Sequence, residues 1–229
     1  MKESGKRLLF LGSLFIVAFV IWTLLIQKVD VQPLGANGTN IGFATINCWF
    51  HKLTGVHMEI YHITDWLGLI PIFICMIFGC IGFSQLIKRR SLLKVDYDII
   101  FLGIYYMMVI FGYLFFEMIP INYRPILIEG FLEASYPSST TLLVLCVMPT
   151  LTEQMNRRSE NAAVKRIIKV FVVCFSIFMV LGRLLSGVHW FTDIVGSVML
   201  SAGLFCIYKA VVLLCYKGKL DRRFCYGIS

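Results

Sequence analysis

Charged side chains are scarce in this sequence. Only 15% of the 229 residues are Asp, Glu, Lys or Arg, while 59% are hydrophobic and the mean hydropathy is +0.81. In soluble domains roughly a quarter of all residues are charged, so this shortage excludes a soluble globular domain and predicts an integral membrane protein. At about 20 residues per helical crossing, the length leaves no room for a separate soluble domain.

The sequence also lacks the spacings that mark nucleotide, metal and disulfide sites. It contains no glycine-rich phosphate loop and no Cys-x-x-Cys pair. Of its 8 cysteines, Cys48 alone lies in a segment predicted to face outward. We therefore expect no structural disulfide, no metal site and no cofactor. The net charge of +8 is interpreted through the side of the membrane on which each Lys and Arg lies, and not as a surface that binds nucleic acid.

Apolar runs bounded by charged residues predict six transmembrane helices. These cover residues 8–27, 63–87, 98–120, 138–155, 167–183 and 192–216. The first run is longer than the 7–15-residue core of a signal peptide and no small-residue cleavage site follows, so it is interpreted as a retained span. The expected fold is an all-α, six-helix polytopic membrane bundle, with residues 1–229 forming a single integral membrane domain.

The basic residues divide unevenly between the two sides of this topology. Of the 21 Lys and Arg residues, 17 lie at the N-terminus, in the connection between the second and third spans, in the region from the fourth to the fifth span, or at the C-terminal end. By the positive-inside rule that side is the cytoplasm. The sequence thus predicts a multi-pass protein of the cell membrane with both termini cytoplasmic.

The outer segment between the first two spans, residues 28–62, has its own pattern. A turn-rich piece precedes residues 41–57, whose apolar spacing predicts a short helix at the membrane interface. Three histidines, His51, His57 and His62, fall here, but their spacings do not place them on one helical face. They are interpreted as interfacial side chains and not as metal ligands.

Two of the four outward basic residues, Arg124 and Arg183, lie at the ends of spans. A charge in such a position is costly unless it reaches the interface or serves a site. Contact with lipid headgroups is the simple interpretation of each arginine alone. A guanidinium fork also suits a phosphate group, which it grips with paired hydrogen bonds.

A short loop then adds a histidine and an aspartate to Arg183. His189 follows after six positions and Asp193 after a further four. If the last span begins near His189, Asp193 lies one turn along the same face. There it could accept the imidazole N–H and fix the tautomer, which leaves the other nitrogen free as a nucleophile or base.

With these residues in place, the sequence resembles the type 2 phosphatidic acid phosphatase (PAP2) superfamily. The family signature has three parts: K-x6-R-P, P-S-G-H and S-R-x5-H-x3-D. Arg124-Pro125 matches the end of the first part and Tyr136-Pro137-Ser138-Ser139-Thr140 the start of the second. Arg183, His189 and Asp193 supply nearly all of the third. The resemblance covers about residues 60–215, preceded by a span and interfacial segment at 1–62.

The resemblance implies a six-span hydrolase acting on lipid-linked phosphates at the outer face of the membrane. By this resemblance His189 would attack phosphorus to form a phosphohistidine and Asp193 would orient it. Arg124 and Arg183 would hold the phosphate oxygens. Ser138, at the start of the fourth span, would add its backbone N–H or hydroxyl, since a helix N-terminus favours an anion.

Departures from the signature affect the proton donor and one cation. Glu117 stands where the family has lysine, and Thr140 where it has the histidine that protonates the leaving group. A threonine hydroxyl is too weak an acid for that task at neutral pH. Ser139 replaces a glycine and Gly182 a serine. Glu117 is interpreted as a salt-bridge partner of Arg124, or as a carboxylic acid kept protonated by burial that supplies the missing proton.

Three functions remain open at this point. The first is a phosphatase acting on a substrate with a good leaving group, such as an isoprenoid diphosphate, which needs little proton assistance. The second is a phospho-group transferase, and the third is a lipid-phosphate binder or transporter without turnover. The expected partners are lipid phosphates or diphosphates and membrane lipids, with no nucleic acid.

Overall fold

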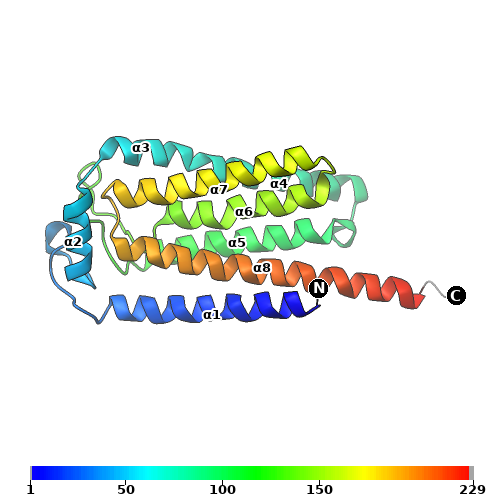
Figure 1. Ribbon diagram of the computed structural model, residues 1–229, viewed down its shortest axis with the longest axis horizontal. Coiled ribbons are helices and arrows are strands. Elements are labelled where there is room, and N and C mark those ends of the chain that lie inside the picture. Colours follow the sequence, from blue (N-terminus) through cyan, green and yellow to red (C-terminus); the bar gives the residue numbers. More distant parts are fainter. Residues whose placement is uncertain (1, 227–229) are drawn as a thin grey trace.

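The protein is an all-helical bundle, described here from a computed structural model (Figure 1). The structure describes residues 2–226, and the side chains of residues 3–215. Within this part of the chain the α-helices are α1 (Lys2–Ile26), α2 (Ala44–Thr54), α3 (Met58–Leu67), α4 (Leu69–Arg89), α5 (Tyr97–Met118), α6 (Ser139–Arg158), α7 (Ala162–Leu185) and α8 (Phe191–Tyr226). Single 3-10 turns lie at Ala36–Gly38 and Leu92–Lys94.

Each of the six predicted spans corresponds to one helix of the bundle, or to two consecutive helices in the case of α3 and α4. Five helical segments are long and apolar enough to cross a membrane: Glu3–Ile26, Met58–Arg89, Tyr97–Met118, Ala162–Leu185 and Phe191–Cys215. The predicted fourth span is α6, which falls outside this set. Many of its side chains, including Thr141, Thr150 and Gln154, are buried against neighbouring helices, so it does not need a fully apolar surface. The prediction of an all-α membrane bundle is confirmed.

The first and last helices pack along one another over much of their length (Figure 1). Gly12 of α1 and Gly203 of α8 make this approach close. A Cβ atom added at Gly12 would lie 3.0 Å from the Gly203 carbonyl oxygen, and one added at Gly203 would lie 3.2 Å from the Gly12 carbonyl oxygen. The N-terminal helix is therefore an integral part of the bundle.

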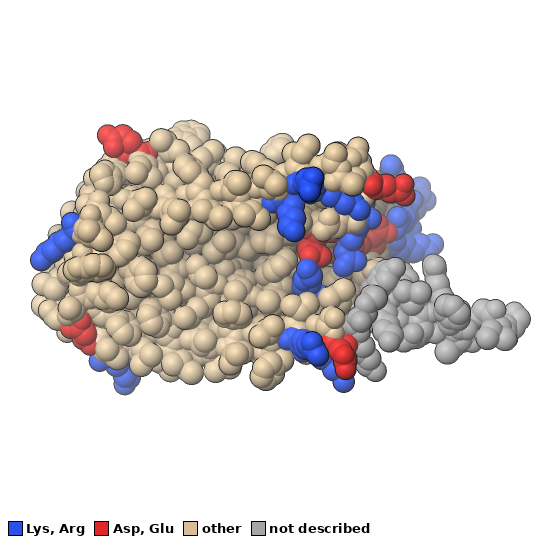
Figure 2. Space-filling view, viewed as in Figure 1, with Lys and Arg blue, Asp and Glu red and all other residues tan. Residues whose placement is uncertain are grey.

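Charge gathers at one end of the bundle, as Figure 2 shows for the face in view. At this end Arg89 pairs with Asp96 at 2.7 Å and Arg158 with Asp98 at 2.8 Å, which ties α4, α5 and α6 together. The structure does not describe the side chains of five further residues near the C-terminal end of this sequence: Lys217, Lys219, Arg222, Arg223 and Cys225. The described basic residues have the uneven distribution that the sequence predicts.

Helix α2 lies across the ends of the long helices at the opposite end (Figure 1). It occupies the middle of the predicted 41–57 helix, and its buried Asn47 faces the start of α8. The Asn47 side-chain amide donates to Thr192 Oγ1 at 3.0 Å, and the Thr192 backbone N–H donates to Asn47 Oδ1 at 3.2 Å. Helix α2 thus anchors the first turn of the last helix.

Candidate active site

The loop between α7 and α8 carries His189 and is held tightly in place. Gly187 has φ +70°, and a Cβ atom there would lie 2.0 Å from the Gly55 carbonyl oxygen, so only glycine fits. His51 contacts the Gly187 carbonyl oxygen through Nε2 at 3.1 Å. The side chains of His57 and His62 are exposed, while the His57 backbone N–H donates to the Ser186 carbonyl oxygen of this loop at 3.0 Å. No group of three metal-binding side chains occurs among the described residues.

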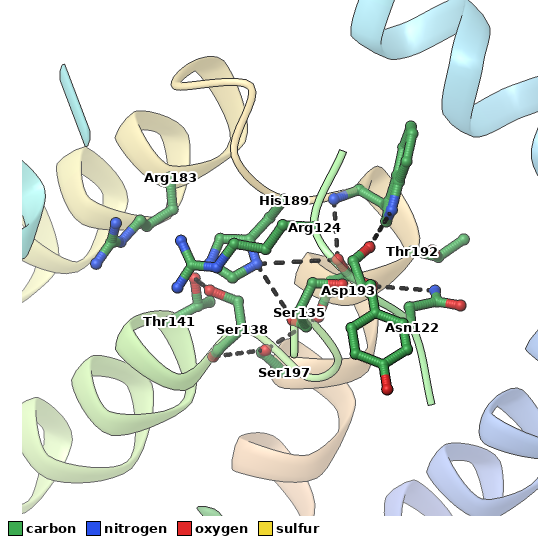
Figure 3. Close-up of polar contacts among 12 residues, drawn as sticks. Asn122, Arg124, Ser135, Ser138, Thr141, Arg183, His189, Thr192, Asp193 and Ser197 are labelled. Atoms are coloured by element: carbon green, nitrogen blue, oxygen red, sulfur yellow. Dashed lines mark hydrogen bonds and ion pairs between the residues drawn. The ribbon is translucent and has the colours of Figure 1, made fainter. Parts of the chain in front are cut away.

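Asp193 lies in the first turn of α8, as predicted, and is fully buried. Its Oδ2 accepts the Trp190 backbone N–H at 2.9 Å, an arrangement that caps the helix N-terminus. Its Oδ1 accepts a hydrogen bond from the Asn122 side-chain amide at 3.3 Å (Figure 3). The carboxylate is thus fixed by two donors.

The imidazole of His189 is buried, and its two nitrogens have different surroundings. Nδ1 lies 3.2 Å from the Ser135 carbonyl oxygen and 3.8 Å from Asp193 Oδ2. Its hydrogen bond goes to Ser135, with Asp193 as a nearby charge, whereas the sequence led us to expect a direct bond to Asp193. Nε2 is buried without a partner among the described residues.

Burial also controls the protonation of His189. Desolvation lowers its pKa to about 4, and this outweighs the opposing effect of Asp193. The imidazole is therefore neutral near pH 7. Because Nδ1 faces the carbonyl oxygen of Ser135, it carries the proton, and Nε2 presents a free lone pair.

Arg124 and Arg183 come from separate segments and meet over one aromatic ring. Their guanidinium carbons lie 5.6 and 4.9 Å from the ring centre of Tyr61, on α3. In both arginines Nε and Nη1 are buried without a partner among the described residues. In Figure 3 the guanidinium of Arg124 lies beside His189, and both residues line one cavity, whereas the side chain of Arg183 extends away from His189 and does not line that cavity. Guanidinium groups with unpartnered N–H groups are suited to a tetrahedral oxyanion.

Each arginine also has a carboxylate partner. Arg183 Nη2 lies 2.7 Å from Asp65 Oδ1 and also donates to Thr140 Oγ1 at 2.5 Å. Arg124 Nη2 lies 3.1 Å from Glu133 Oε2. These pairs orient the buried guanidinium groups and leave their other N–H groups open.

Ser138 lies at the start of α6, but its polar groups are used within the protein. Its N–H faces the Asp193 carbonyl oxygen at 3.4 Å, and its hydroxyl donates to Thr141 Oγ1 at 3.0 Å. Its own carbonyl oxygen accepts from Ser197 at 2.9 Å. Ser138 therefore joins α6 to α8, a role that the sequence did not indicate.

A cavity of about 220 Å³ opens beside these groups. Its lining includes His189, Arg124, Ser139, Glu117 and Glu133. Phe116 also lines it, and the same side chain borders a larger apolar groove of about 1120 Å³ between α1, α4, α5 and α8. A small polar cavity thus adjoins a larger apolar groove.

A family model of the PAP2 superfamily matches residues 8–216, most of the chain. The chain belongs to the PAP2 superfamily. A solved structure described as "the first transmembrane PAP2 type phosphatidylglycerolphosphate phosphatase from Bacillus subtilis" is similar in fold, with a TM-score of 0.63 and 14% sequence identity. The similarity covers 87% of this chain and 94% of that one. No curated protein matches the sequence.

In this PAP2 chain the two departures from the signature have structural consequences. Glu117 is exposed at the cavity wall, so the burial required for a protonated acid is absent. The expected salt bridge from Glu117 to Arg124 is also wrong, because Arg124 pairs with Glu133. Thr140 accepts a hydrogen bond from Arg183. Neither residue replaces the histidine acid of the family.

Several residues of this PAP2 site were not predicted from the sequence. They are Tyr61 and Asp65 on α3, and Asn122, Glu133 and Ser135 in the segment between α5 and α6. Asp65 gave one usable signal, since it is an isolated carboxylate in an apolar stretch. The others contribute through backbone carbonyls or long-range pairs that leave no local pattern.

Proposed function

We propose that the protein is a membrane lipid-phosphate phosphatase that works through a phosphohistidine intermediate. The observation that carries this proposal is His189, which lines the same cavity as Arg124 and whose buried Nε2 has no partner among the described residues. A buried polar atom without a partner is costly in a protein interior. An oriented imidazole with a free lone pair is useful for attack on phosphorus and unnecessary for binding alone.

The reaction follows from the positions of these groups. The open N–H groups of Arg124 and Arg183 bind the phosphate oxygens and offset the charge that develops on them. Nε2 of His189 attacks phosphorus, so an N–P bond forms while the P–O bond to the leaving group breaks. Ser135 and Asp193 stabilise the proton on Nδ1. Water then cleaves the N–P bond, which releases phosphate and restores the imidazole.

The leaving group limits the choice of substrate. Without a histidine at position 140, an alkoxide leaving group receives no strong proton donor, whereas phosphate leaves readily by itself. This chemistry favours isoprenoid diphosphates over simple lipid monophosphates. The apolar groove that begins at Phe116 offers a place for the hydrocarbon chain next to the reacting phosphate.

The site is proposed to face the outside of the cell membrane, with both termini in the cytoplasm. The uneven distribution of basic residues supports this orientation, because few of them lie at the end of the bundle that carries α2 (Figures 1 and 2) and the residues that line the cavity. Substrate would then approach from the outer leaflet.

The direct test is phosphate release by purified protein from a panel of lipid mono- and diphosphates. We expect release from at least one diphosphate, and loss of it in His189→Ala but not in His57→Ala, which changes an exposed histidine. A labelled phosphoenzyme trapped under alkaline conditions would identify the intermediate. If the protein bound lipid phosphates but released phosphate from none of them, the proposed phosphatase would give way to a binder or transporter. If the phosphate appeared on a second lipid, the protein would be a transferase.

A further inference from the structure

Tyr61 on α3 lies where three parts of the candidate site come together. It is 9% exposed and belongs to one apolar cluster with Ile128 and Val188. Ile128 lies in the segment between α5 and α6 that also carries Arg124, and Val188 directly precedes His189. The ring is therefore packed among the supports of the proposed nucleophile and of one phosphate-binding arginine.

Two positive charges share this ring. The guanidinium carbons of Arg124 and Arg183 lie 5.6 and 4.9 Å from its centre, within the distance of about 6 Å at which a cation is attracted to an aromatic face. The two arginines are only 9% and 1% exposed, so water screens their mutual repulsion weakly. An attractive element common to both is needed to keep them together before phosphate binds.

A carboxylate and an aromatic ring hold an arginine in different ways. Glu133 and Asp65 each contact one Nη2 group and offset part of the positive charge. An aromatic ring has no net charge and attracts a cation through its quadrupole, so it leaves the charge available to a phosphate. In both arginines Nε and Nη1 have no hydrogen-bond partner among the described residues. The ring can therefore orient both groups while these donors stay open.

We propose that Tyr61 is a positioning residue for phosphate binding, whose ring holds Arg124 and Arg183 in place for a shared anion. It acts through the two arginines and not on the reacting atoms. This inference rests on the proposed function, because it concerns the same phosphate. It depends on the face of the ring and not on the hydroxyl, so phenylalanine should serve as well as tyrosine.

Packing alone is the alternative role for Tyr61. A packing role depends on the volume and apolar surface of the side chain, whereas attraction of a cation depends on the negative charge of the ring face. Fluorine atoms on a phenylalanine ring withdraw that charge and change its shape little. The two roles can therefore be separated at this one position.

The test measures the binding of inorganic phosphate to the purified full-length protein by isothermal titration calorimetry. Tyr61→Phe should bind phosphate as the wild type does. Tyr61→Leu, which has no ring, should bind it at least about tenfold more weakly, because two cation–π contacts are lost. Phenylalanine with one, two or three ring fluorines, incorporated at position 61 by stop-codon suppression, should weaken binding stepwise.

A second aromatic residue of the same helix provides the control. Trp66 lies five positions further along α3 and its side chain is exposed. Trp66→Leu removes a ring from α3 without touching the two arginines, and we expect it to leave phosphate affinity unchanged. Thermal unfolding of each variant reports any loss of stability separately from binding.

The outcomes separate this inference from the proposed function. A stepwise loss of affinity across the fluorinated series, with Tyr61→Phe unchanged, supports the positioning role. Equal affinity across that series overturns it, even if Tyr61→Leu binds phosphate weakly, because packing alone then accounts for the ring. None of these measurements requires turnover. Phosphate release from lipids and its loss in His189→Ala test only the chemistry.

Discussion

Asp65 on α3 holds the guanidinium of Arg183 on α7, with 2.7 Å between Oδ1 and Nη2. Arg183 is 1% exposed, so its charge is compensated mainly by this carboxylate and by the ring of Tyr61. The pair joins two helices that are far apart in the sequence. It leaves Nε and Nη1 of Arg183 without a partner among the described residues, and these are the groups proposed to bind phosphate.

Replacing Asp65 should therefore impair catalysis through Arg183. We expect Asp65→Ala to lower kcat/KM for lipid phosphate hydrolysis about tenfold, since a charge-assisted hydrogen bond that orients a buried cation is lost. Asp65→Asn keeps an acceptor oxygen and should retain more activity. Glu59→Gln, on the same helix and exposed, is the control. Unchanged kcat/KM in Asp65→Ala would remove Asp65 from the site.

The pH profile should reflect the low pKa of His189. Burial lowers this pKa to about 4, so the imidazole is neutral above that pH and becomes protonated as the pH falls through about 4. Because the neutral form is the proposed nucleophile, kcat/KM should fall as the pH drops through about 4, and not near 6.5. The profile is corrected for the ionisation of the substrate, measured separately by ³¹P NMR. An acid limb near 6.5 would contradict the buried, neutral histidine.

Restoring the missing acid should change the preference for the leaving group. In Thr140→His, hydrolysis of lipid monophosphates should rise relative to diphosphates, because a positioned general acid contributes about 10²–10⁴-fold. Glu117→Lys is added in the same background to remove the repulsion of the phosphate. Thr140→Asn is the matched control, with a polar side chain that cannot act as an acid. If Thr140→His and Thr140→Asn gave the same ratio of monophosphate to diphosphate hydrolysis, that result would argue against a missing acid.

Accessibility of single cysteines tests the orientation in the membrane. In a background without other reactive cysteines, Arg90→Cys and Glu160→Cys should react only with reagents that cross the membrane, because both lie on the basic side. Lys52→Cys on α2 should react with an impermeant reagent added outside. Outside labelling at position 90 or 160 would reverse the proposed topology.

The bundle and the outline of the site could be predicted from the sequence because their signals are local. Apolar runs have the length of a membrane crossing. The spacing of His189 and Asp193 predicted a helix that begins near His189, and the structure has Asp193 in the first turn of α8 with His189 in the loop just before it. Arg124 was recognisable because a lone arginine on the side with few basic residues is costly.

The partners of these residues could not be predicted in the same way. The choice of Glu133 over Glu117 as the partner of Arg124 depends on how the segment between α5 and α6 folds back over the cavity. Ser135 contacts His189 through its backbone carbonyl oxygen, which a residue of any type could supply. Ser138 appeared suited to bind phosphate, but its N–H already donates to Asp193 of α8 and its hydroxyl to Thr141 of α6.

The contact between α1 and α8 bears on how the protein is made. Trp22 donates through Nε1 to the Thr192 carbonyl oxygen at 3.2 Å, and Thr23 bonds the hydroxyl of Tyr136 at 2.7 Å. The first of these bonds joins positions 170 residues apart. A chain leaving the ribosome inserts its first helix long before the last one exists. The pocket is therefore completed only after the α7–α8 loop and the start of α8 have been made, so a chain that stops at the end of α7 contains Arg124 and Arg183 but neither His189 nor Asp193.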